Sequence, residues 1–516
     1  MKRLCLLLLL LPTICACQWM KEDFDDEMAN ATRYINITIS VSADNIPATR
    51  APQGGEYGDG YEKSTKYREN EVEKITLIFY QDNTGINTNS DNAKVVCVKT
   101  YEVHPIEPGD LPNTFVHTHK TTEPDGYADT EIYYSTGDQK LEETTLEAGQ
   151  TYKVLVVANA NVDVSVAPGA KIKDIRNLTF PQIYTGTGLG IDASKFVMTS
   201  ESDATITLTY PTINTEENKA IYYSDCIHIE RLAARIDYCT RGADYNLTYG
   251  GYEYKKKGPN NEVKDIYVVT KVTPFNLYTE PEYYFKRVQD AWPATPPAFY
   301  LGDESTTNWV VDPKTADKTQ EGEGANVIYN ADVLYENRLN YMHDNPNATN
   351  TFSQVMTAVH ETSLYYDGSY DNIIIAYPRE NTLLPDSYLK YYATGVVFEV
   401  DFYKDVNKPN PPQKETRKYY HCLRHQGETL DGPNKNFETK RLDEDHGHKS
   451  FAEDKETCYV KGKPHEDDVL VPMRCGIVRN NIYRISVTGF SDEDGTIILS
   501  IEEEKWRHVD NPPIYI

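Results

Sequence analysis

Apolar and polar residues alternate without a break over positions 34–42, YINITISVS. Ile35, Ile37, Ile39 and Val41 fall on one side, and Asn, Thr and Ser occupy the positions between them. Because successive side chains of a strand point to opposite faces of its sheet, this pattern predicts a strand with one buried face.

Other stretches repeat this pattern along the chain. The segment 71–82, EVEKITLIFYQD, reads as a strand, and the segment 394–405, TGVVFEVDFYKD, alternates with Val396, Phe398, Val400 and Phe402 on one face. In the segment 151–163 the run from Val154 to Val157 is apolar on both faces, which predicts a strand inside a sandwich. Long helical patterns are scarce, so the chain is expected to be mainly β, with few short helices.

The segment 226–240, CIHIERLAARIDYCT, changes phase. Its apolar residues occupy odd positions at Ile227 and Ile229 and even positions from Leu232 onward. A slip of one residue predicts a β-bulge within one strand, between Glu230 and Leu232. An amphipathic helix is the alternative.

The C-terminus alternates again and ends apolar. Tyr483, Ile485 and Val487 form one face, and Ile497, Leu499 and Ile501 form another after a polar turn. Beyond them the chain carries its last apolar side chains, Trp506, Val509, Ile514 and Ile516. An apolar end indicates docking, either into another molecule or into the chain's own sheet.

Two β-sandwich domains are the simplest organisation for these strands, at residues 51–220 and 221–516. Residues 1–17 read as a secretory signal, because a basic start precedes a short apolar run. The run ends in Ile14-Cys15-Ala16-Cys17, which resembles a bacterial lipobox and predicts that Cys17 becomes the lipidated, palmitate-carrying first residue. Ordinary signal-peptidase cleavage is the alternative. Residues 18–50 then form an acidic tether and the first strand.

Composition narrows the function. The 516 residues carry a net charge of −27, which argues against nucleic acid as a partner, because phosphate binding needs a basic surface. No motif indicates a catalytic site, a cofactor or a metal, and no stretch after the signal is long enough to span a membrane. Six cysteines lie outside the signal, and their pairing is open, at Cys97, Cys226, Cys239, Cys422, Cys458 and Cys475.

The first strand is followed by IPATRAPQGG at residues 46–55, a Pro- and Gly-rich loop that contains Arg50. Together with the lipobox, this makes the chain similar to the fimbrillins, the polymerising shaft proteins of type V pili in Gram-negative anaerobes. The order of the landmarks carries the resemblance: Cys17, Thr49-Arg50-Ala51, KVLVVAN at 153–159, IERLAARIDY at 229–238, GIVRNNIYRISV at 476–487, and Trp506.

The resemblance implies two transthyretin-like sandwiches and a structural function without catalysis. An outer-membrane lipoprotein precursor would be cut by an arginine-specific protease between Arg50 and Ala51. The strand with Ile35, Ile37, Ile39 and Val41 would leave, and a segment equivalent to Trp506–Ile516 would replace it in a fimbria on the cell surface. The implied partners are copies of this chain, other pilus subunits, the protease and a ligand on a host or bacterial surface. An anchor or tip adhesin of the same pilus and a surface glycan-binding lipoprotein are the alternatives.

Overall fold

The structure is a computed structural model of the whole chain. It describes residues 31–41, 72–81, 92–105, 115–121, 130–160, 166–180, 196–200, 203–275, 277–278, 281–289, 299–300, 309–310, 313, 338–339, 357–358, 363–366, 371–380, 394–408, 413–422, 440–442, 477–490 and 497–505.

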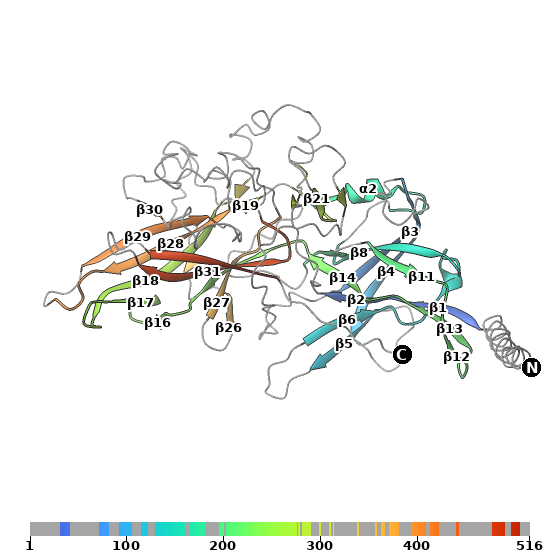
Figure 1. Cartoon of the computed structure of the whole chain (residues 1–516), viewed down its shortest axis with the longest axis horizontal. Helices are drawn as coiled ribbons and strands as arrows, with labels where there is room; N and C mark the ends of the chain where they lie inside the picture. The colour runs from blue at the N-terminus through green and yellow to red at the C-terminus, as the bar shows by residue number, and fades with distance from the viewer. Residues whose placement is uncertain are drawn as a thin grey trace, which may run out of the picture.

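Strands dominate the described residues, and they gather into two groups that lie side by side along the long axis of the molecule (Figure 1). The predicted β class is therefore confirmed. Two short helices occur among the described residues, the 3-10 helix η1 (Leu141–Glu143) and the α-helix α2 (Ile172–Arg176).

The N-terminal group contains two sheets. The smaller has the order β12-β13-β1-β7, with β12 (Thr212–Asn214), β13 (Lys219–Tyr223), β1 (Thr32–Asn36) and β7 (Gln139–Lys140). The larger has the order β10-β14-β2-β6-β5-β4-β3-β8-β11, and β10 pairs with β8 as well. Its strands are β10 (Met198–Ser200), β14 (Ile227–Arg231), β2 (Thr38–Val41), β6 (Thr130–Ser135), β5 (Phe115–Thr121), β4 (Lys94–Pro105), β3 (Lys74–Gln81), β8 (Thr151–Ala158) and β11 (Ala204–Thr207).

The C-terminal group also contains two large sheets. One has the order β26-β27-β15-β31-β32, with β26 (Ser363–Tyr366), β27 (Asp371–Ala376), β15 (Arg235–Cys239), β31 (Asn481–Phe490) and β32 (Ile497–Lys505). The other has the order β16-β17-β18-β28-β29-β30, and β25 also pairs with β18. Its strands are β16 (Asp244–Asn246), β17 (Gly251–Lys257), β18 (Val263–Phe275), β25 (Thr357–Ala358), β28 (Gly395–Tyr403), β29 (Lys414–Cys422) and β30 (Lys440–Leu442).

Short pairings complete the described fold. The strand β9 (Thr179–Phe180) pairs with β20 (Glu282–Tyr283), which links the N-terminal group to a later part of the chain. The remaining short strands are β19 (Leu277–Tyr278) with β24 (Arg338–Leu339), and β21 (Arg287–Gln289) between β22 (Phe299–Tyr300) and β23 (Trp309–Val310).

Buried side chains confirm the strands that periodicity predicted. Val154 to Val157, in β8, are all at most 3% exposed, as expected for a strand covered on both faces. The alternating residues of β28 point into the C-terminal core, where Val396, Phe398, Val400 and Phe402 are buried. Each group therefore builds most of its core from the apolar faces of its own strands, and Tyr377 and Ile482 from the C-terminal part of the chain join the N-terminal core.

The bulge predicted at Glu230–Leu232 is wrong. The segment forms two separate strands, β14 in the larger N-terminal sheet and β15 in a C-terminal sheet, joined by residues 232–234. The phase changes because the chain moves from one sheet to another and buries a different face in each. The domain division after residue 220 stays a prediction. The strands on either side of it, β13 and β14, both pair within the N-terminal sheets.

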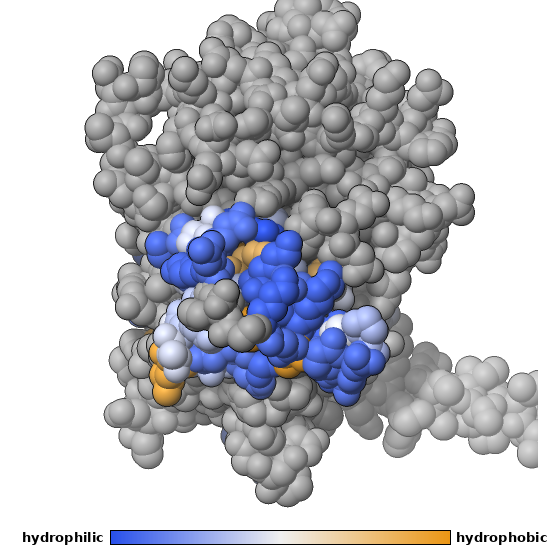
Figure 2. Space-filling view, turned by 90° about the vertical axis from the view of Figure 1, so that its left-hand side faces the viewer, coloured by the Kyte–Doolittle hydropathy of each residue, from blue (hydrophilic) through white to orange (hydrophobic). Residues whose placement is uncertain are grey.

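The end of the molecule formed by the turns of β17–β18 and β28–β29 is largely hydrophilic (Figure 2). Lys257, Asn260, Lys404 and Lys408 are exposed there. One apolar side chain on the β16–β17 turn, Leu247, is also 84% exposed. A solvated surface of this kind keeps the C-terminal group soluble at its outer end.

A candidate strand-exchange groove

The strands β1 and β2 are consecutive pieces of one extended segment that passes from the smaller N-terminal sheet to the larger one. The pieces end and begin on either side of Ile37. In this segment Ile35, Ile37 and Ile39 are 3%, 1% and 0% exposed. Alternation thus places three branched side chains in the core, although the segment belongs to two sheets.

This segment lies in the interior of both sheets. In the smaller sheet β1 runs parallel to β13 and antiparallel to β7, so that Ile35 lies opposite Tyr222 and Gln139. In the larger sheet β2 runs parallel to β14 and antiparallel to β6, so that Ile39 lies opposite Ile227 and Tyr134. Removing the segment would leave unpaired backbone groups on four strands, the edges of what we call the groove.

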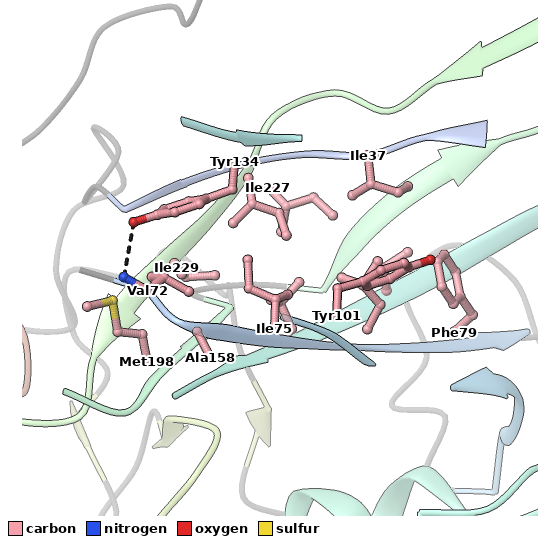
Figure 3. Packing of buried hydrophobic residues seen from close by; sticks show 14 of the residues in the cluster. Ile37, Val72, Ile75, Phe79, Tyr101, Tyr134, Ala158, Met198, Ile227 and Ile229 are labelled. Atoms are coloured by element: carbon pink, nitrogen blue, oxygen red, sulfur yellow. Dashed lines mark hydrogen bonds between the residues drawn. The ribbon is translucent and has the colours of Figure 1, made fainter. Parts of the chain in front are cut away.

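The floor of the groove is the N-terminal hydrophobic core. Ile37 and Ile227 point into this core from one side, and Ile75 and Phe79 of β3 lie on the other side of the same cluster (Figure 3). The Tyr134 hydroxyl accepts a hydrogen bond from the Val72 backbone N–H at 3.1 Å, which holds the ring in place. An empty groove would expose this apolar floor to water.

At the crossing, side chains replace part of the usual strand ladder. The Ile37 N–H donates to Thr136 Oγ1 at 2.9 Å, and the Thr38 N–H donates to Ser224 Oγ at 3.1 Å. In return the Thr136 N–H donates to the Ile37 carbonyl, and the Ser224 N–H donates to the Asn36 carbonyl, both at 3.0 Å. The segment is therefore hydrogen-bonded on both sides while it changes sheets.

The Asn36 side chain adds a second set of contacts here. Its Oδ1 accepts from Ser135 Oγ at 2.8 Å, and its Nδ2 donates to Asp138 Oδ1 at 3.3 Å. We call the four surrounding residues the waist of the groove: Ser135, Thr136, Asp138 and Ser224.

The rim beside the waist is charged. Lys219 Nζ lies 3.2 Å from Asp138 Oδ2 and 2.6 Å from Glu217 Oε2. Hydrogen bonds first to Glu217 and then to Asp138 raise the pKa of Lys219 above its ordinary value. The same ammonium group lies 5.4 Å from the centre of the Tyr34 ring, so the outer face of β1 is also contacted by the rim.

One edge of the groove continues into a buried charge cluster between the two groups of sheets. Glu230 in β14 contacts Lys286 at 2.6 Å, and Arg231 donates from Nη1 to Asn480 Oδ1 at 2.9 Å. Arg479, next to Asn480, donates to Glu380 Oε2 at 3.0 Å. The contact between Arg231 and Asn480 therefore joins β14 to the segment that precedes β31.

Burial perturbs the carboxyl groups of this cluster. It raises the pKa of Glu282 to about 8 and the pKa of Glu230 above its ordinary value, against the opposing attraction of Arg479 and Lys286. The cluster was not predicted from the sequence. Glu230 and Arg231 belong to IERLAARIDY, and Arg479 and Asn480 belong to GIVRNNIYRISV, so the order of these two motifs was the available signal for that part of the cluster. Glu282, Lys286 and Glu380 lie outside both motifs.

Residues 36–231 match the family model described as major fimbrial subunit protein (FimA). The resemblance to the fimbrillins is confirmed. The match begins at Asn36, the last residue of β1, and ends with β14, so it covers β2 and the strands that border the groove and leaves out residues 32–35. It stops where the chain enters the C-terminal sheets. Comparison with curated proteins gives no match.

Solved structures similar to the chain include fimbrial and adhesion proteins. A cell adhesion protein from Parabacteroides distasonis has 13% identity and a TM-score of 0.39, over 92% of this chain and 99% of that one. The tip fimbrial protein Mfa3 from Porphyromonas gingivalis has 9% identity and a TM-score of 0.36, over 92% and 99%. The fimbrilin FimA from the same organism has 14% identity and a TM-score of 0.31, over 93% and 99%.

The predicted site residues of this fimbrillin-like chain fall into two classes. Ile35, Ile37 and Ile39 fill the groove, and Val41 is the last residue of β2, with its side chain outside the described residues. The others lie outside the described residues altogether: Cys17, Arg50, Ala51, Trp506, Val509, Ile514 and Ile516.

The described residues show no sign of a metal site, a membrane-spanning helix or a disulfide. No cluster of His, Cys, Asp and Glu side chains there could hold a metal ion. No described helix is long and apolar enough to cross a bilayer. No disulfide joins Cys97, Cys226 and Cys239 to one another, and Cys422, Cys458 and Cys475 carry no described side chain.

Proposed function

We propose that the protein is a structural subunit of a cell-surface fimbria that assembles by strand exchange and supports adhesion. In this proposal it is exported as a lipoprotein through Cys17 and cleaved between Arg50 and Ala51. The segment 32–41 then leaves with the lipid, and the C-terminal segment of another subunit takes its place. The observation that carries the proposal is the position of this segment in the interior of two sheets.

The energetics favour replacement over an empty groove. Each of the three buried isoleucines contributes about 1.5–3 kcal/mol by its burial. Each backbone hydrogen bond to the flanking strands adds about 0.5–1.5 kcal/mol. A strand from another molecule restores both terms, which is the recognition mode known as strand addition. A donor segment of one subunit in the groove of the next is a head-to-tail contact, and such contacts produce a filament when the rotation between subunits does not close into a ring.

Cleavage sets the order of events. While the chain is uncut, the segment is tethered to its groove and rebinds at once after any transient opening. A cut in the loop 46–55 removes this tether and lets a competing strand displace the segment. Arg33 is a poor alternative cut site, because it lies within β1 and the strand residues 34–41 would stay attached to the rest of the chain. Arg68 is only six residues before the start of β3 at Lys74. We therefore expect a protease to have less room to bind around Arg68 than around Arg50.

The processing step is tested by Arg50→Ala, with Arg68→Ala as the matched control. We expect Arg50→Ala to accumulate as lipidated precursor without filaments, while Arg68→Ala assembles as the parent does. N-terminal sequencing of surface-extracted protein and negative-stain microscopy of the same sample report both steps. Normal filaments from Arg50→Ala would refute cleavage at this site.

The donor is tested separately by deleting residues 510–516. We expect a folded, processed subunit that does not extend a filament. If the truncated protein assembles normally, the donor strand lies elsewhere in the chain.

A further inference from the structure

The waist differs from the rest of the groove because it contacts the occupying segment through side chains. Elsewhere the segment pairs with its neighbours in regular register, which any extended chain can do. At the crossing it is bound by the Thr136 and Ser224 hydroxyl groups and by the Ser135 and Asp138 side chains. Such contacts depend on which residue enters.

We propose that the waist selects the strand that occupies the groove. The preferred occupant has an amide side chain at the level of Asn36, followed by two residues that each carry a backbone N–H. The proposal rests on the strand exchange proposed above and adds to it a rule for the chemistry of the donor.

The amide requirement follows from the two opposite partners of Asn36. Asp138 can only accept a hydrogen bond when ionised, so the Asn36 atom that faces it must be the Nδ2 donor. Ser135 Oγ accepts from the Gly137 N–H at 3.1 Å, so its own proton is directed to Asn36 Oδ1. Among side chains of this length only an amide both donates and accepts in this way. A carboxylate would face Asp138 with like charge, and an apolar residue would remove one hydrogen bond from each partner.

The N–H requirement follows from the two hydroxyl groups. The Thr136 hydroxyl donates to the Gly137 carbonyl at 2.9 Å, which leaves its lone pairs to accept from Ile37. Ser224 Oγ accepts from the next N–H along the segment, that of Thr38. A proline at either position would remove the donor and leave a buried hydroxyl oxygen without its partner.

This rule bears on the chain's own C-terminal segment. After Lys505 the sequence has one amide side chain, Asn511, and it is followed directly by Pro512 and Pro513. Neither proline has an N–H to offer to Thr136 or Ser224. Residues 506–516 therefore lack the pattern, and we expect the groove to bind them more weakly than a donor strand that carries an amide followed by two non-proline residues.

The contact itself is tested in the uncut, full-length chain by a double-mutant cycle on Asn36→Asp and Asp138→Asn. We expect Asn36→Asp alone to lower the Tm by about 2–6 °C, because two carboxylates meet, and the double variant to recover at least half of that loss. Rescue is expected because Asn at position 138 can donate to Asp at position 36. Purely additive effects would overturn the amide contact, whatever the outcome for strand exchange.

Selection is tested with labelled peptides against a nicked full-length chain. Residues 47–50 are replaced by the site of a sequence-specific protease, the chain is cut, and uptake of peptides spanning residues 30–43 is followed by fluorescence anisotropy. The variants are Asn36→Leu, N-methyl-isoleucine in place of Ile37, and the exposed control Thr32→Ala. A peptide of residues 502–516 represents the tail.

We expect the parent and Thr32→Ala peptides to enter equally. The Asn36→Leu, N-methyl and tail peptides should bind about tenfold more weakly or worse, because each loses one or two hydrogen bonds. Binding of Asn36→Leu or of the tail within twofold of the parent would overturn the selection rule. If no peptide enters, the strand exchange fails and selection fails with it, while the cycle in the uncut chain still decides the amide contact.

Discussion

Ile37 offers the sharpest test of how far the N-terminal core depends on the segment that fills the groove. Its side chain is 1% exposed, lies at the crossing and points into the N-terminal core (Figure 3). In Ile37→Ala three carbons are lost from a site that is enclosed on all sides. A substitution of this kind lowers the free energy of unfolding by about 2–5 kcal/mol, because the protein loses the transfer free energy of the removed atoms and also gains a cavity.

The loss is measurable as a shift in melting temperature of the uncut chain. For a region of this size a change of 1 kcal/mol shifts Tm by about 2–4 °C, so a loss of about 3 kcal/mol predicts a fall of about 6–12 °C. Calorimetry is the suitable assay, since it separates the transition of the N-terminal group from that of the C-terminal group. The matched control is Thr38→Ala, one residue along the same segment and half-buried, which should shift Tm by no more than about 2 °C.

A second measurement uses the nicked chain. After a cut in the loop, the same 3 kcal/mol should speed release of the segment by about a hundredfold, since 1.4 kcal/mol corresponds to a factor of ten. Release is followed by size-exclusion chromatography of a labelled segment. If Ile37→Ala melts within 2 °C of Thr38→Ala (the same margin as the control) and releases at the same rate, the core does not rest on the segment. Emptying the groove would then cost little free energy, and the proposed driving force for strand exchange would be absent.

Three further outcomes follow from the same contacts. A disulfide between Tyr34→Cys and Lys140→Cys, which lie opposite each other in β1 and β7, should let cleavage proceed but block assembly until a reductant is added; assembly of the oxidised protein would refute release of the segment. Glu282→Gln should stabilise the protein increasingly between pH 5 and pH 8, because a folded-state pKa of about 8, raised above the ordinary 4.5, gives a contribution that is full below pH 4.5 and is lost as the pH rises to 8. A pH-independent difference in Tm would contradict it. Arg479→Met should cost about 3–5 kcal/mol in denaturant unfolding, because it leaves Glu380 buried without its cation, and a cost below about 1 kcal/mol would contradict that role.

Periodicity was sufficient for the strands whose environment is uniform along their length. Val154 to Val157 are apolar on both faces and lie in a strand covered on both faces, and the alternation of β28 matches one buried face. In both cases the buried positions match the apolar positions of the sequence, because each strand stays within one sheet. The identity of the segment with Ile35, Ile37 and Ile39 as a buried strand could be predicted in the same way.

Changes of sheet were not predictable from periodicity. The alternation of residues 34–42 continues through the crossing at Ile37, so nothing in it shows that two strands in two sheets are involved. In the segment 226–240 the phase does change, but a bulge and a change of sheet produce the same shift of one residue. Periodicity records which face is buried and not which sheet buries it. The waist was missed for a related reason, because Ser135, Asp138 and Ser224 are ordinary loop and strand-end residues in the sequence.

The edges of the groove are held by contacts that do not involve the segment, and this decides whether a vacated groove can accept a donor. β13 also pairs with β12, β6 pairs with β5, and β14 pairs with β10. β14 is fixed further by the contact of Arg231 with Asn480, and by the Leu232 N–H, which donates to the Val197 carbonyl at 2.9 Å. Of the four described strands that border the segment, only β7 has no second strand partner, and it is two residues long. Three of the four edges therefore keep their positions without the segment, so the entering strand meets a preformed site and does not have to order it.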